Sequence, residues 1–318
     1  MTTLVSLGTN PLYYHSQSAC VSTEDGINHT ELAAPFEVHS TCLAAAPNSD
    51  NTVWLAASNS GILSRSTDQG SSWSRYAMIN QRFSLRSVAH TGTGFLITGS
   101  VRQTNNDERA VVYSSTTALN SASWSSVYEN TNAYSALVDL TAVSSTVYAA
   151  VGYLNGVNQP LLVVSTNGGL LWSTVSTTGL PLGMIHSVVY NPSTNRIHVG
   201  GQGWTAWAVW SLVSLAWTVT ELDAGAVVRI RCNSTEVVAI SDNTAWFTNN
   251  SVDWQPVVAP QGYNLTSLVE FNQKWCMGAH SLLNQFTEFR FDTLSEFGAP
   301  IDLTGHQTPV QAHAHWVS

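Results

Sequence analysis

The chain has 318 residues, of which 44% are hydrophobic and 10% are charged, a balance typical of a folded globular protein rather than a disordered one. This length would hold two average domains, but all-β architectures of this size commonly form one. Eleven basic residues against twenty acidic ones give a formal net charge of −9. The charge argues against nucleic-acid binding, which needs a basic face, and an acidic surface poor in Lys also repels anionic lipids.

The amino-terminal segment, residues 1–18, has no basic stretch followed by an apolar run. No segment approaches the ~20 consecutive apolar residues of a membrane-spanning helix. We therefore expect cytoplasmic synthesis without a signal peptide and without membrane insertion, and the final location stays open.

Four cysteines, Cys20, Cys42, Cys232 and Cys276, are widely spaced in apolar runs. The absence of a C-x-x-C pair argues against a zinc ribbon or a thioredoxin-like site. We expect buried free thiols, and a Cys20–Cys42 disulfide is the alternative.

Strand-like runs begin at residues 52–57 and 61–65, where β-branched and aromatic residues are separated by Asn, Ser and Gly, as in hairpins. The octapeptide Ser-Thr-Asp-Gln-Gly-Ser-Ser-Trp follows at 66–73. The same order returns at 147–151 and 160–164, followed by Ser-Thr-Asn-Gly-Gly-Leu-Leu-Trp at 165–172. The chain thus contains an internal repeat, and no amphipathic helical run of useful length.

The shared pattern is Ser-x-Asp/Asn-x-Gly-x-x-Trp. An Asp or Asn side chain can accept hydrogen bonds from amides a few residues later, Gly can adopt the positive φ of a turn, and Trp can bury a large apolar face. Such residues are expected to be structural: Ser66, Asp68, Gly70, Trp73, Ser165, Asn167, Gly169, Trp172 and, from a third copy at 247–254 that keeps Asn249, Trp254. Weaker echoes end at His29, Trp124, Trp217 and Phe297.

This pattern resembles the Asp-box repeat of sialidases, xyloglucan hydrolases, sortilin-like receptors and photosystem assembly factors, which are β-propellers. The resemblance implies a hairpin between the third and fourth strands of each blade, with the Trp packed between blades. It also implies that the box residues are structural rather than catalytic.

Seven repeats of about 45 residues account for all 318 residues. We therefore predict an all-β fold, a single seven-bladed β-propeller of four-stranded antiparallel blades, with six or eight blades as alternatives. The tail from residue 308 alternates like a strand and is expected to close the ring by completing the first blade. The expected blades are residues 1–34 with 308–318, 35–79, 80–131, 132–179, 180–221, 222–258 and 259–305.

Catalysis by a sialidase-like site is disfavoured, because the Arg-Ile-Pro segment implied by that resemblance is missing and the run Val228–Arg231 contains no Pro. A glycosidase with two carboxylates could use Asp139 and Glu270, both on expected innermost strands. The alternative for this pair is a polar lining of a water-filled channel.

Polar residues fall at similar points of the expected innermost strands, where a propeller channel opens. This set of candidate ligand-binding residues comprises Thr41, Arg86, Asp139, His186, Arg229 and Thr266. Fold analogy alone does not establish that they bind a ligand.

Two further clusters could bind ligands. Trp204, Trp207 and Trp210 could stack on sugar rings, or could pack between blades. His313 and His315, with His306 nearby, could suggest a metal site, but no local carboxylate or Cys completes it, so we predict no metal and no cofactor.

The sequence favours a non-enzymatic recognition or structural propeller. Its specific forms are a phage virion component, such as a tail or decoration protein, or a glycan-binding module, with subunits of a larger assembly or a surface glycan as partner. The alternative is a glycoside hydrolase or lyase acting at the channel mouth. An assembly factor for a larger complex is less favoured, because no concentrated basic patch is apparent.

Overall fold

A computed structural model describes residues 4–10, 17–24, 30–36, 42–77, 82–156, 158–212, 214–271, 274–281, 286–291, 301–302 and 311–317. In the outermost parts of the chain, before Ala46 and after Ala279, it describes mainly the backbone. Within these ranges the structure is almost entirely β, with one short 3-10 helix at Ser121–Ser123. No helix there is long and apolar enough to cross a membrane.

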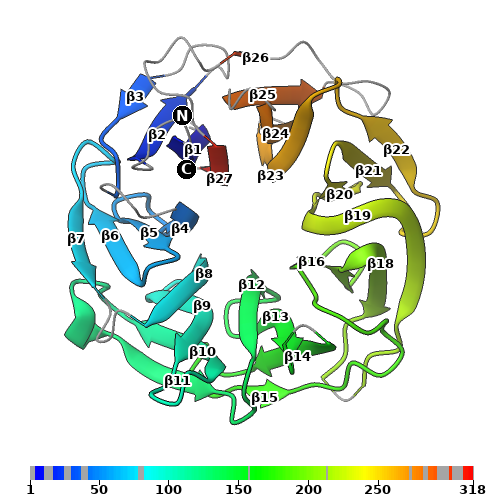
Figure 1. Ribbon diagram of the computed structural model, residues 1–318, viewed down its shortest axis with the longest axis horizontal. Coiled ribbons are helices and arrows are strands. Elements are labelled where there is room, and N and C mark those ends of the chain that lie inside the picture. Colours follow the sequence, from blue (N-terminus) through cyan, green and yellow to red (C-terminus); the bar gives the residue numbers. More distant parts are fainter. Residues whose placement is uncertain are drawn as a thin grey trace.

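The strands form antiparallel sheets arranged in a ring (Figure 1). The first sheet contains β27 (Gln311–Val317), β1 (Leu4–Asn10), β2 (Gln17–Thr23) and β3 (Thr30–Leu32). The second contains β4 (Cys42–Pro47), β5 (Trp54–Ser58), β6 (Ile62–Ser66) and β7 (Ser74–Ala77). The third contains β8 (Phe83–His90), β9 (Phe95–Arg102), β10 (Glu108–Ser115) and β11 (Ser125–Glu129).

The next sheet contains β12 (Ala136–Ala142), β13 (Tyr148–Leu154), β14 (Gln159–Ser165) and β15 (Ser173–Thr174). A seven-stranded sheet follows, with β16 (Ser187–Asn191), β17 (Arg196–Gly200), β18 (Gln202–Val209), β19 (Thr218–Cys232), β20 (Val237–Ser241), β21 (Thr244–Thr248) and β22 (Gln255–Val258). The last sheet contains β23 (Tyr263–Phe271), β24 (Lys274–Ser281), β25 (Phe286–Phe291) and β26 (Ile301–Asp302).

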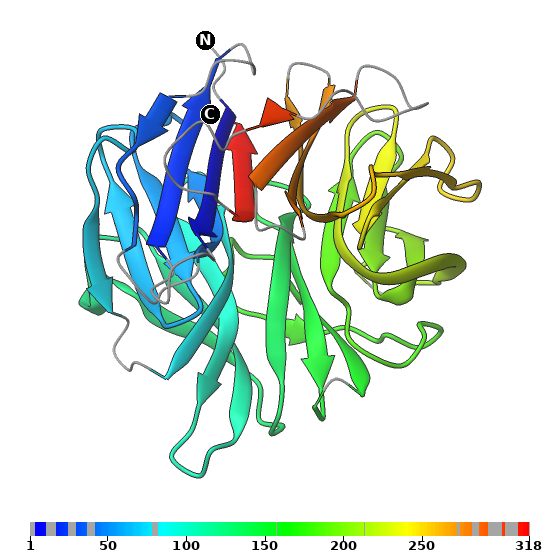
Figure 2. The same ribbon diagram turned by 45° about the horizontal axis from the view of Figure 1, so that its top comes forward.

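The carboxyl-terminal strand joins the amino-terminal sheet. β27 pairs antiparallel with β1, from Leu4 opposite Val317 to Thr9 opposite Gln311. Figure 2 shows the two strands side by side, so the two ends of the chain meet in one sheet.

The seven-stranded sheet arises because one long strand serves two neighbours. The first part of β19, Thr218–Glu221, pairs with β18, and its last part, Val227–Cys232, pairs with β20. The sequence predicts two four-stranded blades here, with a boundary between residues 221 and 222, and β19 runs through that position.

The apolar core lies between neighbouring sheets. In β9, Ile97 packs in a cluster with Leu55 and Leu63 of the preceding sheet, whereas Leu96 packs with Leu137 of the following one. Successive side chains of a strand point to opposite faces, so a strand packed on both sides reads as a continuous apolar run.

The repeated octapeptides close the hairpins between the third and fourth strands of their sheets. At 66–73 the Ser66 hydroxyl donates to Asp68 at 2.8 Å and accepts from the Gly70 N–H at 2.8 Å, while Asp68 accepts from the Ser72 N–H at 2.9 Å. Gly70 has a φ of +84°, where a side chain would be strained.

The copy at 165–172 repeats this geometry. The Gly169 N–H donates to the Ser165 hydroxyl at 3.0 Å, and the Leu171 N–H donates to Asn167 at 2.9 Å. Gly169 also has a positive φ, of +86°, and an added Cβ there would lie 2.6 Å from Leu96 of the preceding sheet. The turn therefore packs closely against Leu96 of the preceding sheet.

The third copy differs by one residue from its predicted alignment. The Val252 and Asp253 N–H groups donate to the Asn250 side chain, each at 2.8 Å, and Asn250 accepts from Thr248 at 3.0 Å. Asn250, rather than Asn249, takes the Asp-like role because this turn is one residue shorter.

Connections between the third and fourth strands also contact the preceding sheet through polar groups. Trp73 donates from Nε1 to the Ala33 carbonyl at 2.8 Å, and Trp124 donates to the Tyr76 hydroxyl at 3.1 Å. Arg196 donates to the Asn250 carbonyl at 3.0 Å. The echo ending at His29 and the one at Phe297 lie outside the described residues.

Replacing Trp172 should measure how strongly its packing between the third and fourth sheets stabilises the fold. Trp172 is partly buried against the cluster that joins the third and fourth sheets, and its Nε1 donates to the Gly169 carbonyl at 2.9 Å. We expect Trp172→Ala to lower the free energy of unfolding by about 2–4 kcal/mol in urea titrations. The matched control is Leu171→Ala, at a side chain that is 71% exposed, with an expected change below about 0.5 kcal/mol. A loss below about 1 kcal/mol for Trp172→Ala would contradict its anchoring role.

Candidate functional site: a cavity among the innermost strands

A cavity of about 210 Å³ lies among strands of four neighbouring sheets. Its walls are formed by Arg86, Val138, Met184, His186, Val228, Arg229 and Thr266. These residues come from β8, β12, β19, β23 and the segment that leads into β16. Four of the six polar residues selected from the sequence as channel candidates, Arg86, His186, Arg229 and Thr266, are therefore brought together here.

Bulges direct side chains into this cavity. The pairing of the innermost strand with its neighbour skips one residue at Arg86, Val138, Val228 and Thr266. All four skipped residues line the cavity. A bulge leaves one residue unpaired and turns its side chain away from the normal alternation, so a recurring bulge supplies most of the cavity wall.

The residue after the bulge is buried on β8, β12 and β23, whereas on β19 it is Arg229, which also lines the cavity. Ser87, Asp139 and Ser267 are 7%, 3% and 2% exposed, and Ser187, which follows His186, is fully buried. Arg229 occupies the equivalent place on β19 and is partly buried. Apart from β19, each of these inner segments therefore places a cavity-lining residue directly before a buried polar one.

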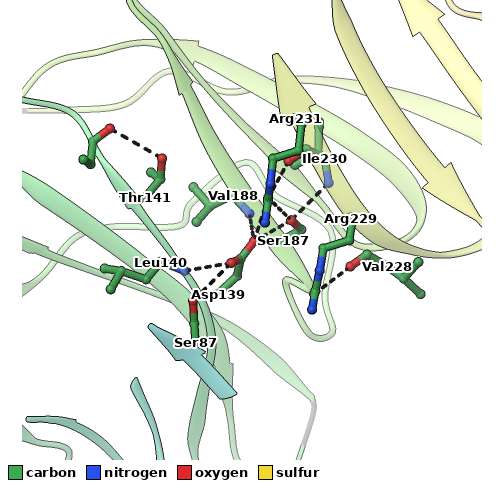
Figure 3. A network of polar contacts seen from close by, with 11 residues as sticks. Ser87, Asp139, Leu140, Thr141, Ser187, Val188, Val228, Arg229, Ile230 and Arg231 are labelled. Carbon is green, nitrogen blue, oxygen red and sulfur yellow. Dashed lines mark hydrogen bonds and ion pairs between the residues drawn. The ribbon is translucent and has the colours of Figure 1, made fainter. Parts of the chain in front are cut away.

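The carboxylate of Asp139 is the centre of a buried polar network (Figure 3). Its Oδ2 atom accepts hydrogen bonds from the Ser187 hydroxyl at 2.5 Å and from the Val188 N–H at 3.1 Å. Its Oδ1 atom accepts from the Leu140 N–H at 3.0 Å and, at 3.5 Å, from the Ser87 hydroxyl. One carboxylate therefore joins β8, β12 and β16.

Arg231 brings β19 into the same network. Its Nη1 atom lies 3.3 Å from Asp139 Oδ2 and donates to the Ile230 carbonyl at 2.7 Å. The Ile230 N–H donates to the Ser187 hydroxyl oxygen at 3.1 Å. Ser187 therefore relays the connection from Asp139 to the next strand.

The environment keeps Asp139 ionised. Burial alone would raise the pKa of its carboxyl, but the charges of Arg231 and Arg229, together with hydrogen bonds from Ser187 and Val188, hold that pKa below its ordinary value. Such a carboxylate does not donate a proton at neutral pH, and its acceptor sites are occupied. Asp139, a channel candidate and fallback catalytic carboxylate in the sequence, is 3% exposed, and the bulged Val138 before it lines the cavity in its place.

No protein-family model and no curated protein matches this chain. Solved structures do. The chain resembles YCF48 bound to D1 peptide, with a TM-score of 0.61, 11% identity and coverage of 82% of this chain and 81% of that one. It resembles Chaetomium thermophilum Sqt1 bound to the N-terminus of ribosomal protein L10, with a TM-score of 0.62, 10% identity and coverage of 91% and 81%.

A third similar structure is the GH74 xyloglucanase from Xanthomonas campestris, with a TM-score of 0.62, 13% identity and coverage of 87% of this chain but 49% of the xyloglucanase. The ring of antiparallel sheets and these likenesses decide the architecture. The chain has a β-propeller fold. At such low identities the likeness extends to the fold alone.

The remaining candidates lie at different places in the propeller. Glu270, the second carboxylate proposed for a glycosidase, is a partly buried residue of β23 and is not among the described residues that line the cavity. Thr41 lies outside the described residues. Among the residues described with side chains, no three His, Cys, Asp or Glu residues gather as a metal site.

The three tryptophans do not form an open stacking surface. Trp204 is 4% exposed within an apolar core cluster, which agrees with packing, the alternative to sugar stacking. The guanidinium of Arg196 lies 3.8 Å from the ring centre of Trp207 and covers one face of it. Trp210 packs edge-on against Tyr190, with the ring centres 6.2 Å apart.

The thiols behave as expected where they are described. Neither Cys232 nor Cys276 forms a disulfide; Cys276 is buried, Cys232 is partly buried, and burial raises the pKa of Cys232 to about 11. The Cys20–Cys42 alternative concerns side chains outside the described part of the chain.

Sequence reasoning missed Val138, Met184, Val228 and Arg231. A sequence signal for Val138 and Val228 was present. Five segments share the order apolar, variable, polar, apolar: Leu85–Val88, Leu137–Leu140, Ile185–Val188, Val227–Ile230 and Leu265–Leu268. The variable position lines the cavity in each of them.

Replacing Asp139 should show that its carboxylate belongs to the scaffold. Asp139→Asn removes the charge that balances Arg231, and we expect the free energy of unfolding at pH 7 to fall by about 2–4 kcal/mol. Because the pKa of Asp139 is lowered on folding, the stabilisation is complete above the ordinary carboxyl pKa and is lost as the pH falls through the lowered one.

The measurement is urea denaturation of wild type and variant across a pH series. The difference should stay constant from about pH 5 to 8 and shrink below about pH 4. Asp253→Asn, at an exposed box residue, is the control and should change stability by less than about 0.5 kcal/mol. An Asp139→Asn protein as stable as wild type would rule out the scaffold role.

Proposed function

We propose that this chain is a non-enzymatic recognition module that binds a protein partner at the cavity among its innermost strands. The observation that carries the proposal is the shared use of bulged residues, from β8, β12, β19 and β23, to line one cavity. Bulges are common beside functional sites because they redirect side chains without breaking the sheet.

The neighbours support a protein partner. YCF48 and Sqt1 are described in complex with a D1 peptide and with the N-terminus of L10. A propeller of this size offers a rigid frame on which such binding costs little ordering of the protein itself. Virion assembly, in a tail or decoration protein, would be one setting for such a partner, and a surface glycan is the other ligand under consideration.

We further propose that the propeller has seven blades of the Asp-box type. The long β19 would then serve as the outermost strand of one blade and the innermost strand of the next, which explains the seven-stranded sheet. The strand β27 would complete the first blade. The hydrogen-bonded turns at 66–73, 165–172 and 248–254 support this assignment.

A glycoside hydrolase at the channel mouth is the second candidate, favoured by the xyloglucanase likeness. It would need an acid and a second carboxylate facing each other across the bond. Asp139 is engaged with Arg231 and Ser187, and the described cavity lining contains no carboxylate. We therefore favour binding without turnover, and no cofactor is required for it.

Filling the cavity should weaken binding. We expect wild-type protein to bind members of a peptide array, and Val138→Trp, which places an indole in the cavity, to weaken that binding at least about tenfold. Val258→Trp, at a 61% exposed residue of the outer strand β22, is the matched control and should bind normally. Unfolding curves of all three proteins would verify that they are folded.

The same proteins should be incubated with arrayed glycans and the products analysed. Release of sugars would support the hydrolase. Peptide binding that Val138→Trp leaves unchanged would place the binding site elsewhere and contradict the proposal.

A further inference from the structure

The cavity is rich in positive charge for so acidic a protein. The chain has 11 basic residues and a net charge of −9. Three of those 11, Arg86, Arg229 and Arg231, lie in or directly behind the cavity on two inner strands, β8 and β19. In the described structure one of these three arginines, Arg231, forms an ion pair, and its partner is Asp139.

Two of the guanidiniums retain donors for a ligand. Among the described residues, Arg86 is exposed and makes no hydrogen bond or ion pair. Arg229 donates to the carbonyl of Val228 at 3.1 Å, and Figure 3 shows it beside Asp139 without a bond to it. An Arg side chain offers five N–H donors, so most of those on both residues have no acceptor in this part of the protein.

The rest of the cavity wall is neutral. Burial lowers the pKa of His186, and the charge of Arg229 lowers it further, so His186 is uncharged at pH 7. The remaining lining residues are Val138, Val228, Met184 and Thr266. An anion would therefore meet two cations and no described lining carboxylate.

We propose that the group bound in this cavity is a carboxylate of an acidic peptide segment of the protein partner, held by Arg86 and Arg229; this rests on the proposed function. Guanidinium and carboxylate are both planar and pair through two parallel hydrogen bonds. The carboxylate supplies the acceptors that the two Arg residues lack.

The wall chemistry favours a peptide over an acidic sugar. Carbohydrate rings commonly stack on aromatic faces, and the described lining contains Val138, Val228 and Met184 but no Phe, Tyr or Trp. Aliphatic walls suit the methylene groups of Asp and Glu side chains. The net charge of −9 also disfavours a polyanion such as nucleic acid, because only a short segment would lie within the positive region.

Selection from a displayed random peptide library tests the proposal. We expect peptides selected by wild-type protein to be enriched in Asp and Glu over the starting library. A synthetic peptide from that selection should lose at least about tenfold in affinity when its acidic residues are changed to Asn and Gln, because a charged hydrogen bond contributes about that much.

Arg86→Gln is the main variant, since Arg86 is exposed and its loss should not affect folding. This variant should bind the acidic peptide at least about tenfold more weakly than wild type does. It should bind the amide-substituted peptide with the same affinity as wild type. Arg229→Gln should act in the same direction, and its thermal unfolding curve would report any effect on the Asp139 network. The control is Arg102→Gln, at an exposed residue of β9 away from the cavity lining, which should bind as wild type does.

The outcomes separate this proposal from the function beneath it. Selected peptides without acidic enrichment, yet sensitive to Val138→Trp, would retain the recognition function and overturn the carboxylate. Acidic enrichment that survives Arg86→Gln and Arg229→Gln together would also overturn it. Binding of uronic acid oligosaccharides but not of peptides, lost on Arg86→Gln, would show that the ligand is an acidic sugar and overturn the peptide. Failure to select any peptide would count against the recognition function itself.

Discussion

The hydrogen bonds and ion pair of Asp139 connect the innermost strands of three neighbouring sheets. One carboxylate accepts from the Val188 backbone, from Ser187 and from Leu140, and Arg231 neutralises its charge. Propeller sheets contact each other mainly through apolar faces, which are not directional. The buried Asp139 carboxylate and its partners are directional, because a buried charge that loses its partners costs free energy. Neighbouring sheets are thereby fixed in register where the cavity forms.

The side chains of the innermost strands fall into two sets. The buried polar residues Ser87, Asp139 and Ser187 connect one strand to the next. The bulged residues Arg86, Val138 and Val228 face the cavity and are left to determine its chemistry. In this chain the scaffold network and most of the cavity lining therefore lie on different residues, so the lining could change without breaking the network.

Much of the architecture could be predicted from the repeat, because the box residues are local. Ser66, Asp68 and Gly70 form one turn among themselves, so their order in the sequence is also their order in space. The inner strands were less predictable. Strict alternation assumes a period of two, and a bulge adds one residue and moves every later side chain to the other face. The prediction therefore selected Asp139 where Val138 faces the cavity.

Other differences arise from interactions that the sequence does not reveal. The turn after β21 is one residue shorter than its relatives, which moves the hydrogen-bonding amide from Asn249 to Asn250. Trp204 and Trp207 have the same side chain, but one lies in the core and the other beneath Arg196. Which aromatic residue is covered depends on how the strands pair and pack, such as the pairing of β17 with β18 that brings Arg196 near Trp207.

The Asp139 carboxylate belongs to the scaffold, and the guanidiniums of Arg86 and Arg229 lie at the cavity without an ion-pair partner among the described residues. Anomalous diffraction from crystals soaked in sodium bromide tests this most directly, because bromide marks sites that attract anions. We predict a bromide peak in the cavity within contact distance of Arg86 or Arg229. Bromide bound at the outer surface, with none in the cavity, would contradict it.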